Sequence, residues 1–174
     1  MTDTPALSAV KSAARDWRSA VIQDFARSAL FQRTFQEGMD LVEETASYLD
    51  GAGRQASKAL HRDQALAYAS ESMRLTTRLM QVASWLLVQR AVREGDMAPA
   101  SACEERYRLT ADDAREDAEV TGLPHDLAGL LARSEQLYER VRHLDRRMYV
   151  EHDADEAAHP VLAQHDRLKS AFGA

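Results

Sequence analysis

The residues of this sequence that could perform chemistry are mainly histidines and carboxylates. Carboxylate-bridged di-iron sites in helical bundles use repeated Glu-x-x-His pairs, and Glu156 and His159 form one such pair. The pair directly precedes Pro160 and has no second copy, so it supplies half of a motif. His152, His159 and His165 match no closed zinc-binding pattern. We therefore expect no metal site and no cofactor.

Two other local features have an ordinary structural interpretation. His143 lies in "ERVRHLDRRM", where the flanking arginines could steady a phosphate, but they serve equally as a basic helix face. Cys103 is the only cysteine, which excludes an intrachain disulfide and favours a reducing compartment. We find no Gly-rich phosphate loop, nucleophile elbow or catalytic acid dyad. The sequence therefore predicts a protein that is not an enzyme.

Composition narrows the class of protein further. The 174 residues fit one domain, and the 45% hydrophobic content is enough to build a core. A formal net charge of −6 opposes a broad contact with nucleic acid or with a membrane surface. The longest apolar run, "WLLV", is too short to span a bilayer, and the first residues lack the pattern of a signal peptide. We expect a cytoplasmic protein.

Three helices are predicted, at about residues 27–50, 63–94 and 126–151, because apolar residues recur there at steps of three and four. Gly51 and Gly53 can take the left-handed conformation that ends helices, and Asp63 is a suitable N-cap for the second helix. No segment alternates β-branched and polar residues as a strand would. The predicted fold is all-α: an antiparallel three-helix bundle with a long central helix.

The remaining segments differ in composition from these helices. Residues 1–25 predict a weak helix, and the bundle is assigned to residues 26–152. The stretch "GDMAPASACEERYRLTADDAREDAEVTGLPHDL" predicts a long acidic crossover loop that is only partly ordered. Residues 153–174 are polar, rich in small side chains and contain a proline, so we expect a flexible C-terminal tail.

The central helix carries more apolar residues than one buried face needs. Projected at 100° per residue, it shows two stripes typical of a core: Leu66, Ala69, Met73, Met80, Leu87 and Ala91, and Tyr68, Leu75, Leu79, Val82 and Leu86. A third stripe of Trp85, Val88 and Val92 would then be exposed, and exposed apolar patches with a Trp often mark contact surfaces. The alternative is that the N-terminal segment, with Trp17 and Phe25, covers this stripe.

Two arginines on the same helix also allow two interpretations. Arg74 and Arg78, with Glu71 and Gln81 nearby, could form a solvated face of ion pairs. Alternatively, a guanidinium group on a rigid helix can recognise the carboxylates of a partner. The candidate residues for contact with a partner or a second copy are Arg74, Arg78, Gln81, Trp85, Val88 and Val92.

The sequence also resembles a known family. The blocks "EGMDLVEETASYLDGAGRQASKAL" and "LAYASESMRLTTRLMQVASWLLVQRAVREGDM", and more loosely "LPHDLAGLLARSEQLYERVRHLDRRM", are similar to the RcdA (regulator of CtrA degradation) family of proteolysis adaptors in alphaproteobacteria. The resemblance implies a dimeric three-helix bundle without catalytic activity. It also implies that the protein joins the ClpX unfoldase once a single-domain response regulator has primed it.

This family delivers cell-cycle regulators to the ClpXP protease, works with a second adaptor that binds cyclic di-GMP, and acts at a cell pole. The alternative is a helical dimeric scaffold in polar or cell-cycle signalling that does not deliver cargo to a protease. The terminal "AFGA" has a form that AAA+ unfoldases can engage. The candidate residues for recognition of the tail are Leu168, Phe172, Gly173 and Ala174.

Overall fold

The computed structural model describes residues 5–110 and 122–149, and within these ranges the regular elements are helices. They are α1 (Pro5–Arg27), α2 (Ala29–Asp50), α3 (Ala52–Lys58), α4 (Arg62–Glu94), α5 (Pro99–Ala102), the 3₁₀ turn η1 (Glu105–Tyr107) and α6 (His125–Tyr149). The all-α fold class is confirmed. Most of the acidic part of the predicted crossover loop, and the whole predicted tail, lie outside the described residues.

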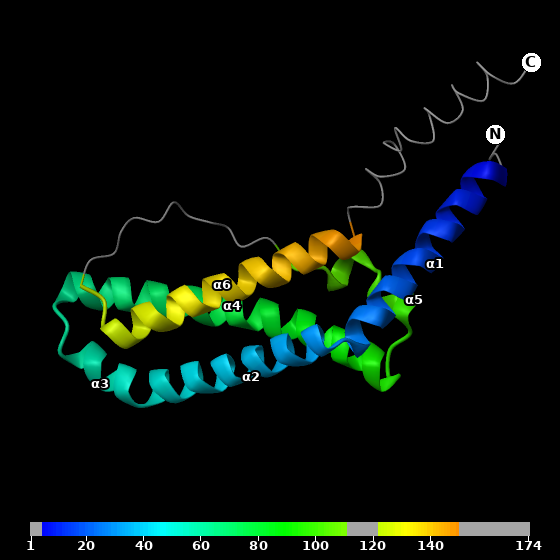
Figure 1. Cartoon of the computed structure of the whole chain (residues 1–174). Coiled ribbons are helices and arrows are strands. Elements are labelled where there is room, and N and C mark those ends of the chain that lie inside the picture. The colour runs from blue at the N-terminus through cyan, green and yellow to red at the C-terminus, as the bar shows by residue number, and fades with distance from the viewer. Residues whose placement is uncertain (1–4, 111–121, 150–174) are drawn as a thin grey trace, which may run out of the picture.

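The bundle is formed by α2, α4 and α6, which lie side by side (Figure 1). Two ion pairs, Arg133 to Glu44 and Arg140 to Glu37, join α6 to α2 with opposite chain directions. In contrast, α4 and α6 run in the same direction (Figure 1). The antiparallel arrangement therefore holds only between α2 and its two neighbours, because the long crossover loop returns the chain to the starting end of α4.

The helix ends differ in detail from the sequence prediction. Ser28 caps α2 by accepting a hydrogen bond from the Phe31 N–H at 3.1 Å. Gly51 has a φ of −105° and Gly53 lies within α3, so neither takes the predicted left-handed conformation. Gly95 does take it, with a φ of 85°, at the end of α4. The N-cap of α4 is His61, so Asp63, the predicted cap, lies two residues later in the first turn of the helix.

The last turns of α1 belong to the hydrophobic core. Ile22 and Ala26 are fully buried, and Phe25 packs against the same cluster. The structure therefore supports the alternative in which the N-terminal segment covers apolar surface on the central helix. Among the helices of residues 5–110 and 122–149, none combines the length and the apolar character that a membrane-spanning helix needs.

The three main helices approach closely at Gly38 of α2. A Cβ atom at this position would lie 2.7 Å from Leu86 Cδ1 and 3.7 Å from Leu137 Cδ2, and both leucines are fully buried. We expect Gly38→Val to lower the free energy of unfolding by about 1–3 kcal/mol, because the packed core must shift to admit the side chain. Urea unfolding of the native chain and of Gly38→Val measures this difference in the free energy of unfolding.

Gly129→Ala on α6 is the matched control, because a Cβ there meets nothing within 4 Å. It should raise the stability by about 0.5–1 kcal/mol through helix propensity alone. Equal effects of the two substitutions would contradict the close approach at Gly38.

Tyr48 and Tyr68 pack around Gly53 at the opposite end of the bundle from α1. A Cβ at Gly53 would lie 2.6 Å from both Tyr48 Cε1 and the Tyr68 hydroxyl. Burial, followed by the charges of Tyr68 and Asp126, raises the pKa of Tyr48 above its ordinary value of 10.0, although the Leu127 N–H opposes this. The folded state therefore favours the neutral phenol.

The stability of the protein should consequently depend on alkaline pH. A raised pKa in the folded state contributes stability that is complete below pH 10.0 and is lost as pH rises through the folded pKa. We expect the free energy of unfolding to fall more steeply above pH 10 in the native chain than in Tyr48→Phe. Urea unfolding at neutral and alkaline pH measures this, and parallel pH profiles would contradict it.

Candidate interaction site

Trp85, the central residue of the stripe predicted to be exposed, lies in the core. Its side chain is 2% exposed, and its ring centroid lies 5.8 Å from that of Phe25 in α1. The indole Nε1–H donates a hydrogen bond of 2.9 Å to Asp145 Oδ1 in α6. The prediction of an exposed Trp85 stripe is therefore wrong, because α1 and α6 together cover this face of α4.

The other five predicted contact residues occupy different environments. Arg78 and Val92 are buried, and the Arg78 guanidinium donates to Ser134 Oγ at 3.2 Å, so neither is available on the surface. Arg74 pairs with Glu71 at 3.1 Å, but the two side chains are only 28% and 14% exposed, so the predicted solvated face of ion pairs is not formed. Gln81 and Val88 are half-buried. The structure brings Gln81, Trp85 and Val88 together in one pocket.

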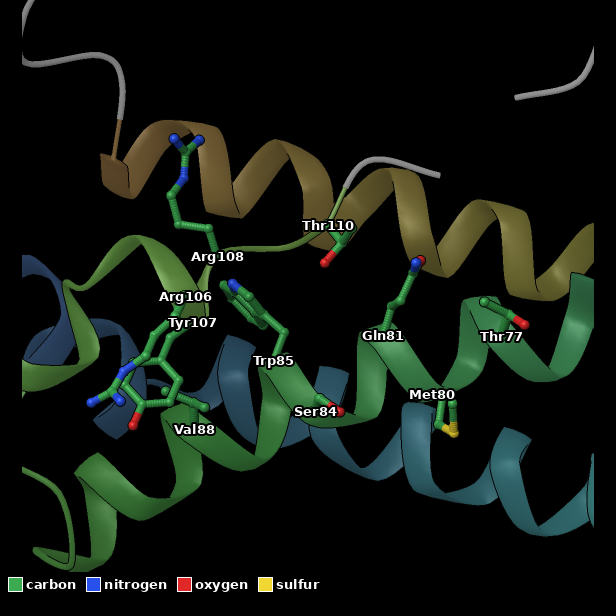
Figure 2. Close-up of a pocket in the computed structure, with 10 residues that line it drawn as sticks. All are labelled: Thr77, Met80, Gln81, Ser84, Trp85, Val88, Arg106, Tyr107, Arg108 and Thr110. Carbon is green, nitrogen blue, oxygen red and sulfur yellow. The ribbon is translucent and has the colours of Figure 1, made fainter. Parts of the chain in front are cut away.

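This pocket, of about 410 Å³, lies between α4 and the segment 106–110 that follows α5. In Figure 2, Gln81 and Trp85 project from α4 toward the segment that ends at Thr110. The lining combines apolar side chains, hydroxyls and two guanidinium groups: Thr77, Met80, Gln81, Ser84, Trp85, Val88, Arg106, Tyr107, Arg108 and Thr110. Such a lining suits a ligand that presents both carboxylates and apolar groups.

Asp145 holds the wall of this pocket in place. Its carboxylate is 3% exposed and accepts hydrogen bonds from the Trp85 indole and, at 3.2 Å, from the Leu109 N–H. Arg108 lies 3.5 Å from its second oxygen. The Tyr138 hydroxyl also donates to the Thr110 carbonyl oxygen at 2.8 Å. Residues 108–110 are therefore fixed to α6, and Asp145 joins this part of α6 to Trp85 of α4.

The sequence analysis missed Asp145. It lies four residues after Val141 and three before Met148, and both of these are buried, so helical spacing places it on the buried face of α6. A carboxylate on a core stripe is a signal for a buried hydrogen-bond acceptor.

The exposed face of α4 is a different one from that predicted. Leu66, Met73, Met80 and Leu87 are 65%, 71%, 63% and 50% exposed, although they were assigned to a core stripe. The reason is that α1, α2 and α6 pack on the rest of α4 and leave this face uncovered. We call these four residues the exposed row; successive members are seven residues apart, which is two helical turns.

An apolar groove of about 210 Å³ adjoins the exposed row at Met80. Its walls come from α2 and α4: Val42, Thr45, Ala46, Leu49, Thr76, Leu79, Met80 and Ala83. The row and the groove together form an apolar surface that would bury well against another helix.

The residues considered for chemistry do not form a site in the part of the chain that is described. No group of three potential metal ligands occurs among residues 5–110 and 122–149. His143 is exposed on α6. Cys103 is half-buried, and its thiol donates to the Pro99 carbonyl oxygen at 3.3 Å. His152, Glu156, His159 and His165, and the tail candidates Leu168, Phe172, Gly173 and Ala174, lie outside the described residues.

Comparison with known proteins identifies relatives of this chain. A family described as a protein of unknown function, DUF1465, matches residues 22–172. Among solved structures, RcdA from Caulobacter crescentus CB15 matches with 69% sequence identity and a TM-score of 0.63, over 74% of this chain and 98% of that chain. Comparison with curated proteins found no match.

Proposed function

The chain belongs to the RcdA-like family, and from this membership we propose that it takes part in the degradation of CtrA as a non-enzymatic adaptor. It tethers cell-cycle regulators to the ClpXP protease after a single-domain response regulator has primed ClpX. A second adaptor that binds cyclic di-GMP extends the range of cargo. The protein acts in the cytoplasm, is recruited to a cell pole, and promotes cell-cycle progression through regulated proteolysis.

The exposed row on α4 is the structural observation that carries the proposal of an interaction protein. Large apolar side chains that are 50–71% exposed along one helix favour contact with another protein. The occupant that fits best is a second copy of the chain, since the row is symmetric along the helix. Leu66 and Leu87 lie equally far from the midpoint between Thr76 and Thr77, and so do Met73 and Met80.

Two antiparallel copies of α4 crossing at that midpoint would therefore place leucine on leucine and methionine on methionine. A two-fold dimer requires such a self-complementary surface. The residues between these pairs are small. Ala69 would lie opposite Ser84, which allows the two helices to approach closely. Asp63 would lie opposite Arg90, with opposite charge. This proposal replaces three of the predicted contact candidates, the buried residues Arg78, Trp85 and Val92, as the dimer surface.

Binding to immobilised ClpX, with and without the response-regulator primer, tests the proposed adaptor role. We expect the full chain to be retained only when the primer is present. A chain truncated after Asp153 shows whether the tail candidates Leu168, Phe172, Gly173 and Ala174 contribute to retention. Absence of retention under both conditions would contradict the proposal and favour the alternative of a scaffold that does not contact the protease.

A further inference from the structure

We propose that the pocket between α4 and segment 106–110 is a docking site for the chain's own C-terminal segment, residues 150–162. This inference does not depend on the adaptor role, although Met80 and Ser84 of the pocket also lie on the proposed dimer surface. It rests on where α6 ends, on the charges at the rim of the pocket, and on the length of the pocket along α4.

The segment begins beside the pocket. Helix α6 ends at Tyr149, and Asp145, about 6 Å earlier along the helix axis, contacts both Trp85 and Arg108 in the pocket lining. The chain that follows Tyr149 therefore starts within a few residues of the pocket. A segment tethered this closely docks at a high effective concentration, so weak contacts are sufficient to hold it.

The charges of the segment and of the pocket rim are complementary. Residues 151–156 contain four acids, Glu151, Asp153, Asp155 and Glu156. The rim supplies Arg106 and Arg108, and the last turn of α6 adds Arg146 and Arg147.

Both rim arginines already have a carboxylate neighbour within the chain. Arg106 pairs with Glu104 at 2.9 Å, but the two side chains are 65% and 49% exposed, so this pair is easily exchanged for another. Arg108 approaches buried Asp145 at 3.5 Å and keeps a third of its side chain exposed.

The length of the segment also fits the pocket. The lining residues on α4 extend from Val88 back to Thr77, about 16 Å along the helix axis. The seven residues from Glu156 to Leu162 span about 20 Å in extended conformation, at about 3.3–3.6 Å for each of the six steps. When the acids lie at the arginine rim beside Val88, Val161 and Leu162 reach the apolar side chain of Met80 at the other end of the lining (Figure 2). One continuous segment thus satisfies the charged end and the apolar end of the pocket.

The acids of the crossover loop are a weaker match for the rim. The chain enters this loop at Thr110, beside Tyr138, and leaves it at Gly122, beside Gln64. Gln64 lies in the first turn of α4, whereas Arg106 and Arg108 lie toward the end of α6. The loop therefore starts at the pocket but leads away from the arginine rim to the other end of the bundle, and its acids provide a control.

Paramagnetic relaxation in the full chain tests the docking directly. A nitroxide is attached at Ala157→Cys in a Cys103→Ser background, where serine can keep the hydrogen bond to the Pro99 carbonyl oxygen. We expect broadening of the amide signals of Ser84, Val88 and Thr110. High salt should remove it, because exposed ion pairs are screened. Replacement of the four tail acids with Asn or Gln should remove it as well.

Matched variants make the test specific. Arg106→Glu should abolish the broadening, whereas Arg93→Glu, at an exposed position of α4 outside the pocket, should not change it. Neutral replacement of the acids in residues 111–121 should also leave it unchanged. Three results would overturn the proposal: no broadening at the pocket, broadening that persists in the neutralised tail, or broadening seen only between differently labelled copies of the chain.

Discussion

Replacement of Trp85 with alanine should lower the free energy of unfolding by about 3–5 kcal/mol, the range for loss of a large buried aromatic side chain. The ring is 2% exposed and packs against Phe25, so α1 would lose this aromatic contact with α4. The buried Asp145 carboxylate would also lose the hydrogen bond from the indole. A buried acceptor with fewer donors lowers the free energy of unfolding further. Urea unfolding followed by circular dichroism measures the change.

Two further variants separate the contributions to this effect. Trp85→Phe keeps most of the packing but removes the donor, so we expect a loss of about 1–3 kcal/mol. Trp17→Ala, at a side chain that is 39% exposed, should cost about 1 kcal/mol or less. If Trp85→Ala proved as mild as Trp17→Ala, the core position of Trp85 would be contradicted.

Simultaneous substitution of Met73→Glu and Met80→Glu should convert the proposed dimer into a folded monomer. The two side chains are 71% and 63% exposed in the single chain, so their replacement removes little buried area on folding. In the proposed dimer each would face the other across the two-fold axis, and four acids would meet in an apolar contact. Sedimentation velocity, together with thermal unfolding, distinguishes dissociation from loss of the fold.

Leu30→Glu is the matched control for the double substitution. Leu30 is 43% exposed but lies on α2, outside the exposed row. This variant should remain dimeric at the concentrations where the double variant is monomeric. A double variant that stays dimeric would show that the exposed row is not the interface, and a double variant that unfolds would show that these side chains support the fold.

The sequence predicted helices with a single apolar face well. In α2 the stripe through Phe31 has one interpretation, because the opposite side is polar, and the helix forms close to the predicted bounds. The buried face of α4 was harder to predict, because the second half of this helix carries apolar side chains on all sides. Periodicity gives the angle between stripes but does not state which stripe faces a neighbour. The predicted core stripe of Leu66 and Met73 is exposed, and the predicted exposed stripe of Trp85 is buried.

The exchange of the two stripes has a physical cause in α1. The sequence predicted only a weak helix for the N-terminal segment and left its packing on α4 as an alternative, yet Ile22 and Ala26 are fully buried and Phe25 lies against Trp85. Tertiary packing thus decided the orientation of α4, which local sequence does not determine. The pocket was equally inaccessible to sequence reasoning, since it requires segment 106–110 to return against α4 and to bond Asp145.

The rate of CtrA degradation by primed ClpXP, measured with and without this chain, is the most direct test of the proposed adaptor role. We expect substoichiometric amounts of the chain to accelerate degradation, because an adaptor is released after each delivery and acts again. A matched reaction without the response-regulator primer should show no acceleration. Binding of CtrA without any change in its rate of degradation would contradict the adaptor role and leave a scaffold.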